Sequence, residues 1–425
     1  MIAWLLISFF VLLFLGVPIA MSLGLSAMGG ILFLGGGSTV TIAQRMFEGM
    51  NSFALLAIPL YTFAGFTMSK GGISKRLMDF CYSIVGHIYG GLAHVNVLSS
   101  MIFAGISGSA VADTAGVSGM FMPEMIRKGY SKNFTVAVTA ISSTIGIIIP
   151  PSIPMVVIAG ICGISTGKLF LGGIIPGILC GLAQMIVSYF LAKKEGVRKE
   201  PGHFTIGPVL HGLWESWPAL LMPIIIVGTI TMGIVSPTEA GVIAVVYGLF
   251  AGGIIYRELK WEDIKFAFAE TVRTSGRIFI VIGAAKLYTV MLTTAGFDKW
   301  VAKTMLGFST NPTVILIMIL LIFFIVTMFM ESIATLTLFM PILYPIALGV
   351  GINPIVLSVL ITVVIGIGLV TPPVGMCIYV ACDLMDTTVG EVFPTLVPFI
   401  AATFVCIALM VAFPQLILLP TYLMA

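Results

Sequence analysis

The sequence predicts an all-α polytopic membrane protein with inverted repeats, about 11 membrane helices and two re-entrant helical hairpins. The first observation is composition: 59% of the 425 residues are hydrophobic, only 9% are charged, and the mean hydropathy is +1.17. The second is a pair of Pro-Pro segments at corresponding places in the two halves, 146–151 and 368–373. The third is an uneven distribution of lysine and arginine along the chain. Together these observations favour a protein that moves a solute across a membrane.

Composition and motif content exclude several other classes of protein. The formal net charge is only +3, so nothing favours a nucleic-acid partner. The six cysteines lie mostly in apolar runs and form no CxxC pair, which is typical of small buried residues. No HExxH, nucleophile elbow, phosphate loop or paired metal-ligand spacing occurs. We therefore expect neither an enzyme nor a nucleic-acid-binding protein.

Apolar runs bounded by glycine, proline and polar residues predict the elements of the first half. The first run lacks the basic start of a signal peptide and is followed by further membrane segments, so we expect a retained helix. A polar stretch, 193–215, separates the halves. The predicted elements are helices near 2–16, 18–36, 52–69 and 78–92, a hairpin at 94–128, a broken helix at 133–163 and a helix at 168–192.

The second half contains the same kinds of element after the polar stretch. Its predicted elements are helices near 217–235, 238–256 and 276–295, a hairpin at 313–347, a broken helix at 354–384 and a last helix at 391–420. The whole chain then divides into six regions. These are a first scaffold region with an interfacial arm (1–92), a first transport region (93–166), a connecting helix and loop (167–215), a second scaffold region with an arm (216–312), a second transport region (313–389) and the last membrane helix (390–425).

Each Pro-Pro pair is expected to break a membrane helix, because proline removes a backbone donor and clashes with the preceding turn. Free backbone carbonyls at membrane depth are tolerated only next to protein or a water-filled cavity. One such pair alone would favour a simple kink. Two pairs at equivalent positions, each following a hairpin, indicate a transporter with a binding site near the midplane. We expect each hairpin tip to meet the break in the following helix.

Lysine and arginine fall mainly on one side of the predicted membrane. With 193–215 in the cytoplasm, that side has 15 of these residues, including Lys70 and Arg277, and the other side has four. This asymmetry places both termini outside, and it makes the two hairpins open to opposite sides. The segments 120–123 and 338–341 also match in sequence. The repeats are therefore expected to be inverted.

Small residues, hydroxyls and two carboxylates mark the hairpin tips. Segment 105–116 suits a tip where serine and backbone oxygens surround a hard cation and a helix N-terminus faces a substrate carboxylate. A small-residue packing seam is the alternative interpretation. In the register of the repeats, Asp113 corresponds to Glu331. Either carboxylate is a candidate for direct ion or substrate contact, and either could instead start a helix as its cap.

Lys286 and two amphipathic segments have more than one interpretation. Lys286 could contact an anionic substrate, but pairing with a partner subunit or snorkelling to the interface is favoured. Segments 70–83 and 297–307 follow helices that end in Gly72 and Gly296. They are predicted to be interfacial arms that join a fixed scaffold to a moving unit, although plain surface helices would have the same pattern.

Over essentially its whole length the chain resembles the large membrane subunit of tripartite ATP-independent periplasmic (TRAP) transporters. The motifs that carry the resemblance are 105–116 with 121–125, 146–154, 329–341 and 368–375. The resemblance implies a sodium-driven importer in the bacterial inner membrane, with the elevator architecture of the ion-transporter superfamily. It also implies a small four-helix membrane subunit and a soluble periplasmic substrate-binding protein as partners. The family carries organic acids, and we favour sialic acid, followed by a C4-dicarboxylate.

The resemblance also assigns residues to two Na⁺ sites and a substrate site. The first Na⁺ site would use Ser107, Ser109, Gly146, Ile149 and Pro150. The second would use Glu331, Ser332, Thr335, Thr371 and Gly375. The substrate would contact Ser109, Asp113, Ser152, Thr335 and Pro372.

Two other functions agree with the same sequence pattern. One is the membrane subunit of a sodium-pumping decarboxylase, which would couple ion export to a soluble biotin-bearing enzyme. The other is an autonomous sodium/anion symporter that needs no binding protein. In all three cases most of the outer surface is expected to contact membrane lipid.

Overall fold

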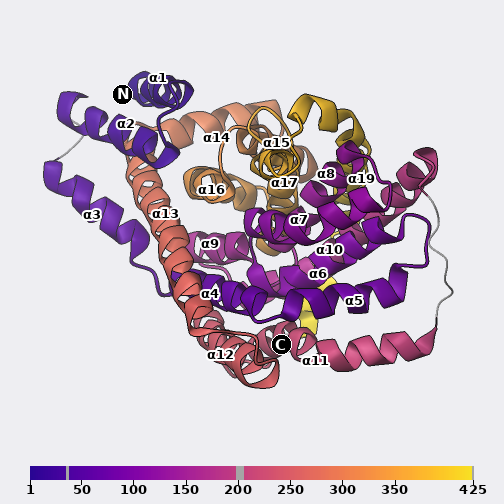
Figure 1. The fold of residues 1–425 in the computed structure, drawn as a ribbon. Coiled ribbons are helices and arrows are strands. Elements are labelled where there is room, and N and C mark those ends of the chain that lie inside the picture. Colours follow the sequence, from indigo (N-terminus) through magenta and orange to yellow (C-terminus); the bar gives the residue numbers. More distant parts are fainter. Residues whose placement is uncertain (35–37, 198–204, 424–425) are drawn as a thin grey trace.

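The computed structural model describes residues 1–34, 38–197 and 205–423, and the predicted connection 193–215 lies partly outside these ranges. In the described residues the chain forms twenty α-helices and no strand (Figure 1). Seven helices are long and apolar enough to cross a membrane, and six shorter helices are also apolar. The predicted all-α polytopic membrane class is thus confirmed.

The first half contains ten α-helices, and its helical hairpin and broken helix lie close to the predicted segments. The helices are α1 (Ile2–Phe14), α2 (Ile19–Leu34), α3 (Thr39–Met50), α4 (Ala57–Lys70), α5 (Ile73–Val85), α6 (Gly91–Ser107), α7 (Ala110–Arg127), α8 (Lys132–Ser143), α9 (Ile153–Cys162) and α10 (Thr166–Lys194). The hairpin is α6–α7, and the broken helix is α8–α9 with a 3₁₀ turn, η2 (Thr144–Ile147), at the break.

The second half contains the other ten α-helices and has an equivalent hairpin, α15–α16, and broken helix, α17–α18. Its helices are α11 (Ile206–Thr231), α12 (Pro237–Phe250), α13 (Trp261–Thr294), α14 (Phe297–Phe308), α15 (Pro312–Thr327), α16 (Ser332–Gly349), α17 (Pro354–Gly368), α18 (Met376–Asp383), α19 (Val389–Ala412) and α20 (Gln415–Leu418). The Pro150–Pro151 and Pro372–Pro373 peptide bonds are both cis.

Two predicted helices are wrong because glycine and proline end them early. No helix spans 78–92: α5 ends at Val85, and Gly90 takes a left-handed φ of 72° at the start of α6. A side chain on Gly91 would also meet the backbone of Gly86, so the chain needs glycine to turn here. The last long helix ends at Ala412 rather than 420, because Pro414 cannot continue it.

Two further elements differ from the prediction because they contain charged residues. α3 was not predicted, since Arg45 and Glu48 lower its hydropathy, but Ser38 caps it by accepting a hydrogen bond from Val40 N. α13 has 34 residues and starts at Trp261, well before the predicted start at 276. The prediction began too late because the first half of this helix is polar. At 1.5 Å per residue it is about 51 Å long.

α13 is the longest helix in the described part of the chain. Figure 1 shows it running along one side, with α2 and α3 on its outer side and α4 and α16 against its inner side, in agreement with their contacts. The two interrupted helices lie in the core: every residue from Phe134 to Ser143 of α8 and from Val356 to Gly368 of α17 is buried. The first break sits inside protein, as free backbone groups at membrane depth require, whereas the second has exposed residues at Pro373 and Val374.

Both predicted arms are separate helices that start after a left-handed glycine. Gly72 has a φ of 79° before α5, and Gly296 has a φ of 82° before α14. A side chain at Gly72 would collide with the Glu258 carboxylate. Glycine is therefore needed at this turn for both its backbone conformation and its small size.

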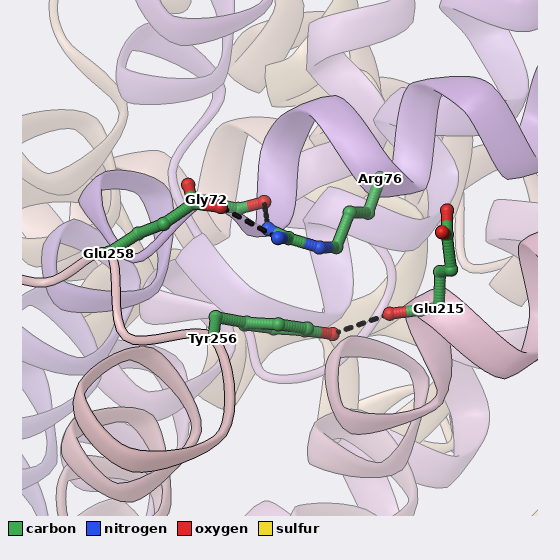
Figure 2. Close-up of polar contacts among 5 residues, drawn as sticks. All are labelled: Gly72, Arg76, Glu215, Tyr256 and Glu258. Carbon is green, nitrogen blue, oxygen red and sulfur yellow. Dashed lines mark hydrogen bonds and ion pairs between the residues drawn. The ribbon is translucent and has the colours of Figure 1, made fainter.

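A polar cluster fastens α5 to the second half of the chain (Figure 2). Arg76 pairs with Glu258 at 2.6 Å, donates to Gly72 O at 2.7 Å, and places its guanidinium 4.3 Å from the centroid of the Tyr256 ring. The Tyr256 hydroxyl in turn donates to Glu215 O at 3.0 Å. Burial raises the pKa of Tyr256 to about 12, so this hydroxyl keeps its proton at physiological pH. The cluster ties the first arm to α11 and to the α12–α13 connection.

Candidate functional site

Both hairpin tips line one cavity of about 680 Å³. The tip between α6 and α7 contributes 106–113, and the tip before α16 contributes 331–334. The remaining walls come mainly from α4 and α13. A cavity of this size is within the range of small-molecule sites in proteins. Of the predicted site residues, it brings together Ser107, Ser109, Asp113, Glu331 and Ser332.

The first tip is organised by two serines. Ser109 is the N-cap of α7 and accepts a hydrogen bond from Ala112 N at 3.5 Å. Ser107 is the last residue of α6; its hydroxyl accepts from Ser109 N at 3.2 Å and donates to Asp113 Oδ1. Gly108 between the serines has a left-handed φ of 66°, which lets the chain reverse within one residue. Because Ser109 is the cap, the alternative in which Asp113 caps α7 is wrong.

Asp113 has one carboxylate oxygen without a protein hydrogen bond. The side chain is only 4% exposed, and among the described residues Oδ2 has no partner. This oxygen lies against Gly146 in the broken helix, where a Cβ would overlap it. A buried charged oxygen without a partner is costly, so it calls for a cation or another donor.

The second tip uses its carboxylate differently. Glu331 is the N-cap of α16, and its Oε2 accepts from Ile333 N at 2.9 Å and from Ala334 N at 3.3 Å. Its other oxygen accepts from the Ser332 hydroxyl at 3.0 Å. The cap interpretation therefore holds for Glu331, and both of its oxygens have protein partners.

Each tip meets the break in the following helix, as predicted. Ile153 N, at the start of α9, donates to Gly108 O at 3.2 Å. In the second half, Val374 N donates to Met328 O at 3.0 Å. In each half, the hairpin and its broken helix are thus joined through backbone atoms.

The other predicted site residues do not line the cavity, and the hydroxyls among them donate to backbone carbonyls of the preceding turn. Ser152 donates to Ile147 O at 2.5 Å, Thr335 to Glu331 O at 3.1 Å and Thr371 to Ile367 O at 2.7 Å. Lone pairs on these hydroxyls stay free to accept or to coordinate. The residues that do not line the cavity are Gly146, Ile149, Pro150, Ser152, Thr335, Thr371, Pro372 and Gly375.

The residues of the first tip fit a hard cation. In the described part of the chain, no group of three His, Cys, Asp or Glu side chains gathers to hold a metal. A cation site here would therefore use one carboxylate together with hydroxyl and backbone oxygens, which is the ligand set that hard cations prefer. Asp113 and Ser107, beside the break at Gly146, offer such oxygens.

Sequence reasoning missed five polar residues of the cavity wall, and two of these, Thr62 and Ser69, lie on α4. Arg277 and Thr274 on α13 and Lys70 at the end of α4 line the cavity with the tips. The sequence analysis uses the charges of Lys70 and Arg277 for the orientation in the membrane and does not assign them to the site. A useful signal was available: Thr274, Arg277, Ile278 and Val281 follow the i, i+3, i+4, i+7 spacing of one helix face.

Lys286 does not line this cavity. Its stem packs on Gly49 of α3, where a Cβ would lie 2.6 Å from Lys286 Cβ. The hydrogen bond from Arg45 and, next, the charge of Lys286 hold the pKa of Glu48 below its usual value. Lys286 therefore compensates the acidic side chain of α3 and is not placed to touch a solute in the cavity.

Comparison with known proteins identifies the family. Residues 6–416 match the family described as tripartite ATP-independent periplasmic transporter, DctM component. An isethionate TRAP transporter permease, DctMQ, of Oleidesulfovibrio alaskensis is 37% identical over 92% of this chain, which spans only 62% of that longer protein. The sialic acid TRAP transporter large permease SiaM of Vibrio cholerae is 35% identical over 96% of this chain and 95% of its own length.

Solved structures agree on the fold alone. The YdaH transporter of Alcanivorax borkumensis superposes with a TM-score of 0.59 over 87% of this chain and 86% of its own, at 14% identity. Family membership also removes the interpretation as a decarboxylase subunit. The chain is thus a multi-pass inner-membrane protein that belongs to the DctM family, the large permeases of tripartite ATP-independent periplasmic transporters.

Proposed function

We propose that this chain couples the inward movement of Na⁺ to the import of an organic acid. The observation that carries the proposal is the single cavity lined by both hairpin tips, one of which holds a buried carboxylate oxygen without a protein partner. Na⁺ at the first tip would bind Asp113 and Ser107, which neutralises the charge and fixes the tip against the break at Gly146. The second tip would offer Ser332 and Thr335 hydroxyls to another Na⁺.

The proposed cycle includes an elevator movement, which the way the elements are joined supports. Each hairpin is bonded through its backbone to the following broken helix, so the pair would move as one body. The polar cluster around Arg76 instead fastens the first arm to α11 and to the α12–α13 connection, which would remain fixed. Na⁺ contributes only if it binds the loaded conformation preferentially, because a ligand with equal affinity for two states shifts neither.

The orientation proposed from the charge distribution puts the cavity opening at the cytoplasmic side. Lys70, Arg273 and Arg277 lie toward this side, where lysine and arginine are enriched in membrane proteins. Both termini would then be periplasmic. The conformation described here would be inward-facing.

Two protein partners complete the proposed transporter. A periplasmic substrate-binding protein would deliver the acid, and a small four-helix membrane subunit would support the scaffold. The permease from O. alaskensis exceeds the length matched by this chain, so additional segments are joined to the matching part in that relative. For this chain both partners are proposed as separate polypeptides.

An anionic organic substrate is supported by the cavity and by the relatives. The relatives are named for sialic acid and for isethionate, a carboxylate and a sulfonate. The cavity offers two helix N-termini and two cationic side chains, all of which favour an anion. We favour sialic acid, followed by a C4-dicarboxylate, and isethionate is a third candidate.

Uptake into proteoliposomes tests the proposal. The chain would be reconstituted with its small subunit, and uptake of labelled sialic acid, succinate and isethionate would be measured with and without an inward Na⁺ gradient and the binding protein. Uptake of one acid that requires both Na⁺ and the binding protein is expected. Uptake that needs Na⁺ but no binding protein would instead support an autonomous symporter. Uptake that is indifferent to Na⁺ would overturn the coupling.

A further inference from the structure

One face of α13 forms a wall of the cavity. Thr274, Arg277, Ile278 and Val281 lie on this face and line the cavity together with the hairpin tips. Arg277 is the only charged member of the four. It lies 16 residues into the helix, which is about 24 Å from its first residue.

Arg277 has no counter-charge. In the part of the chain that the structure describes, its guanidinium makes no hydrogen bond and no ion pair. Arg273, one turn earlier on α13, pairs instead with Glu270 at 2.6 Å and does not line the cavity. Arg277 is exposed and lines the cavity, so water can reach its guanidinium there and an anion can take the place of that water. The partner of Arg277 is therefore expected to enter the cavity from outside the chain.

Neither carboxylate of the cavity compensates Arg277, although Asp113 keeps one oxygen without a protein partner. Glu331 accepts hydrogen bonds at both oxygens, and Asp113 is bound by Ser107 and faces Gly146. Neither makes an ion pair with Arg277 in the described residues. The arginine is thus not explained by charge compensation within the site.

Lys70 supplies a second cation to the same cavity. Its Nζ lies 4.8 Å from the centroid of the Phe266 ring, whose edge-on contact with Phe66 holds it in place. This cation–π contact leaves the ammonium free to attract an anion as well. Lys70 belongs to α4, whereas Phe266 and Arg277 belong to α13, so two helices present positive charge to one space.

We propose that Arg277, assisted by Lys70, binds the carboxylate or sulfonate group of the substrate on the release side of the cavity. This inference rests on the proposed function. A guanidinium suits the role because its planar donors can bind both oxygens of a carboxylate at once. The hairpin tips would hold the rest of the substrate and the Na⁺ ions.

The position of Arg277 makes this contact specific to one conformation. α13 is part of the proposed scaffold, whereas the tips belong to the proposed moving units. The proposed elevator movement would carry the tips away from Arg277, so they would share the cavity with it only in the conformation described here. Arg277 therefore strengthens binding from the cytoplasmic side and has little influence on capture of substrate from the binding protein.

The site can be tested without a transport assay by measuring how organic acids bind to the purified complex of this chain and its small subunit. Thermal stability would be recorded against increasing concentrations of sialic acid, succinate and isethionate, with uncharged N-acetylmannosamine as the control ligand. Arg277→Gln should weaken stabilisation by the acid that the wild type binds by about tenfold, and Arg277→Lys should weaken it less. Arg273→Gln is the matched control and should retain wild-type affinity, because Arg273 lies outside the cavity.

The outcomes separate this inference from the proposed function. Equal affinity in wild type and Arg277→Gln, with Na⁺-dependent uptake intact, would overturn the role of Arg277 alone. A wild type that neither binds nor takes up any of the three acids would overturn the proposed function, and this inference with it. If Arg277→Gln does not fold, Arg277→Lys and Lys70→Gln replace it, and wild-type affinity in both would overturn the site.

Discussion

At the first hairpin tip the serine hydroxyl of Ser109 caps α7, and the Asp113 carboxylate lies one turn further in. At the second tip the Glu331 carboxylate is itself the cap of α16. Asp113 keeps one oxygen without a protein partner, whereas both oxygens of Glu331 accept hydrogen bonds. The two tips therefore have similar groups with different tasks.

The difference comes from where each helix begins relative to its proline. Asp113 and Glu331 both stand ten residues before a proline, Pro123 and Pro341. The caps do not share this register, because Ser109 stands 14 residues before Pro123. α7 is thus about one turn longer on this side. Asp113 therefore lies inside its helix, whereas Glu331, at the corresponding position, is the cap of its helix. Because Asp113 does not cap a helix, its carboxylate is free to bind a cation.

Removing the charge of Asp113 should have the largest effect. Asp113→Asn keeps the size of the side chain and an oxygen that accepts from Ser107, but it removes the negative charge beside Gly146. We expect Na⁺-dependent uptake to fall by about 100-fold, since losing a charged ligand oxygen costs about 2–3 kcal/mol. Initial uptake rates over a Na⁺ titration measure this. Unchanged Na⁺ activation would remove Asp113 from the proposed Na⁺ site.

A methyl group at Gly146 should act through the same carboxylate. The added Cβ of Gly146→Ala would overlap Asp113 Oδ2, so the carboxylate must move. We expect apparent Na⁺ affinity to fall by about tenfold, as overpacking at a buried site costs about 1–3 kcal/mol. Gly119→Ala in α7 is the matched control, because a Cβ there has no neighbour within 4 Å.

The double variant shows whether the two residues act together. In an Asp113→Asn background, Gly146→Ala should cause little further loss of Na⁺ activation, because the charged group that it displaces is already gone. Fully additive losses would mean that Gly146 acts through the packing of the broken helix instead.

The hairpins and breaks were predictable because their signals are local. Prolines at 150–151 and 372–373 interrupt helices wherever those helices pack. The roles of the two carboxylates were not predictable, since Asp and Glu both cap helices and the start of α7 is set by Ser109. The spacing of Thr274, Arg277, Ile278 and Val281 marks one face of α13, but only the packing of α13 against α16 shows that this face lines the site.

Glu331 should tolerate loss of charge better than Asp113 does. The amide oxygen of Glu331→Gln can still accept from Ile333 N, so uptake should stay within about threefold of wild type. Glu331→Ala removes the cap and should lower stability by about 1 kcal/mol. Uptake and the thermal unfolding midpoint of the purified complex measure these effects. If the Glu331→Gln variant were as inactive as Asp113→Asn, both tips would bind cations through their carboxylates.

The smallest effect on stability is expected at Ser109. Its capping bond to Ala112 N is 3.5 Å long, against 2.9 Å for the shorter bond to Glu331, so Ser109→Ala should lower stability by less than about 1 kcal/mol. The thermal unfolding midpoint should therefore fall less than in Glu331→Ala. Uptake supplies a second readout, because the Ser109 hydroxyl is also a proposed Na⁺ ligand. A loss of apparent Na⁺ affinity in Ser109→Ala without a matching loss of stability would assign the hydroxyl to the cation, whereas parallel small losses would leave it only as the cap of α7.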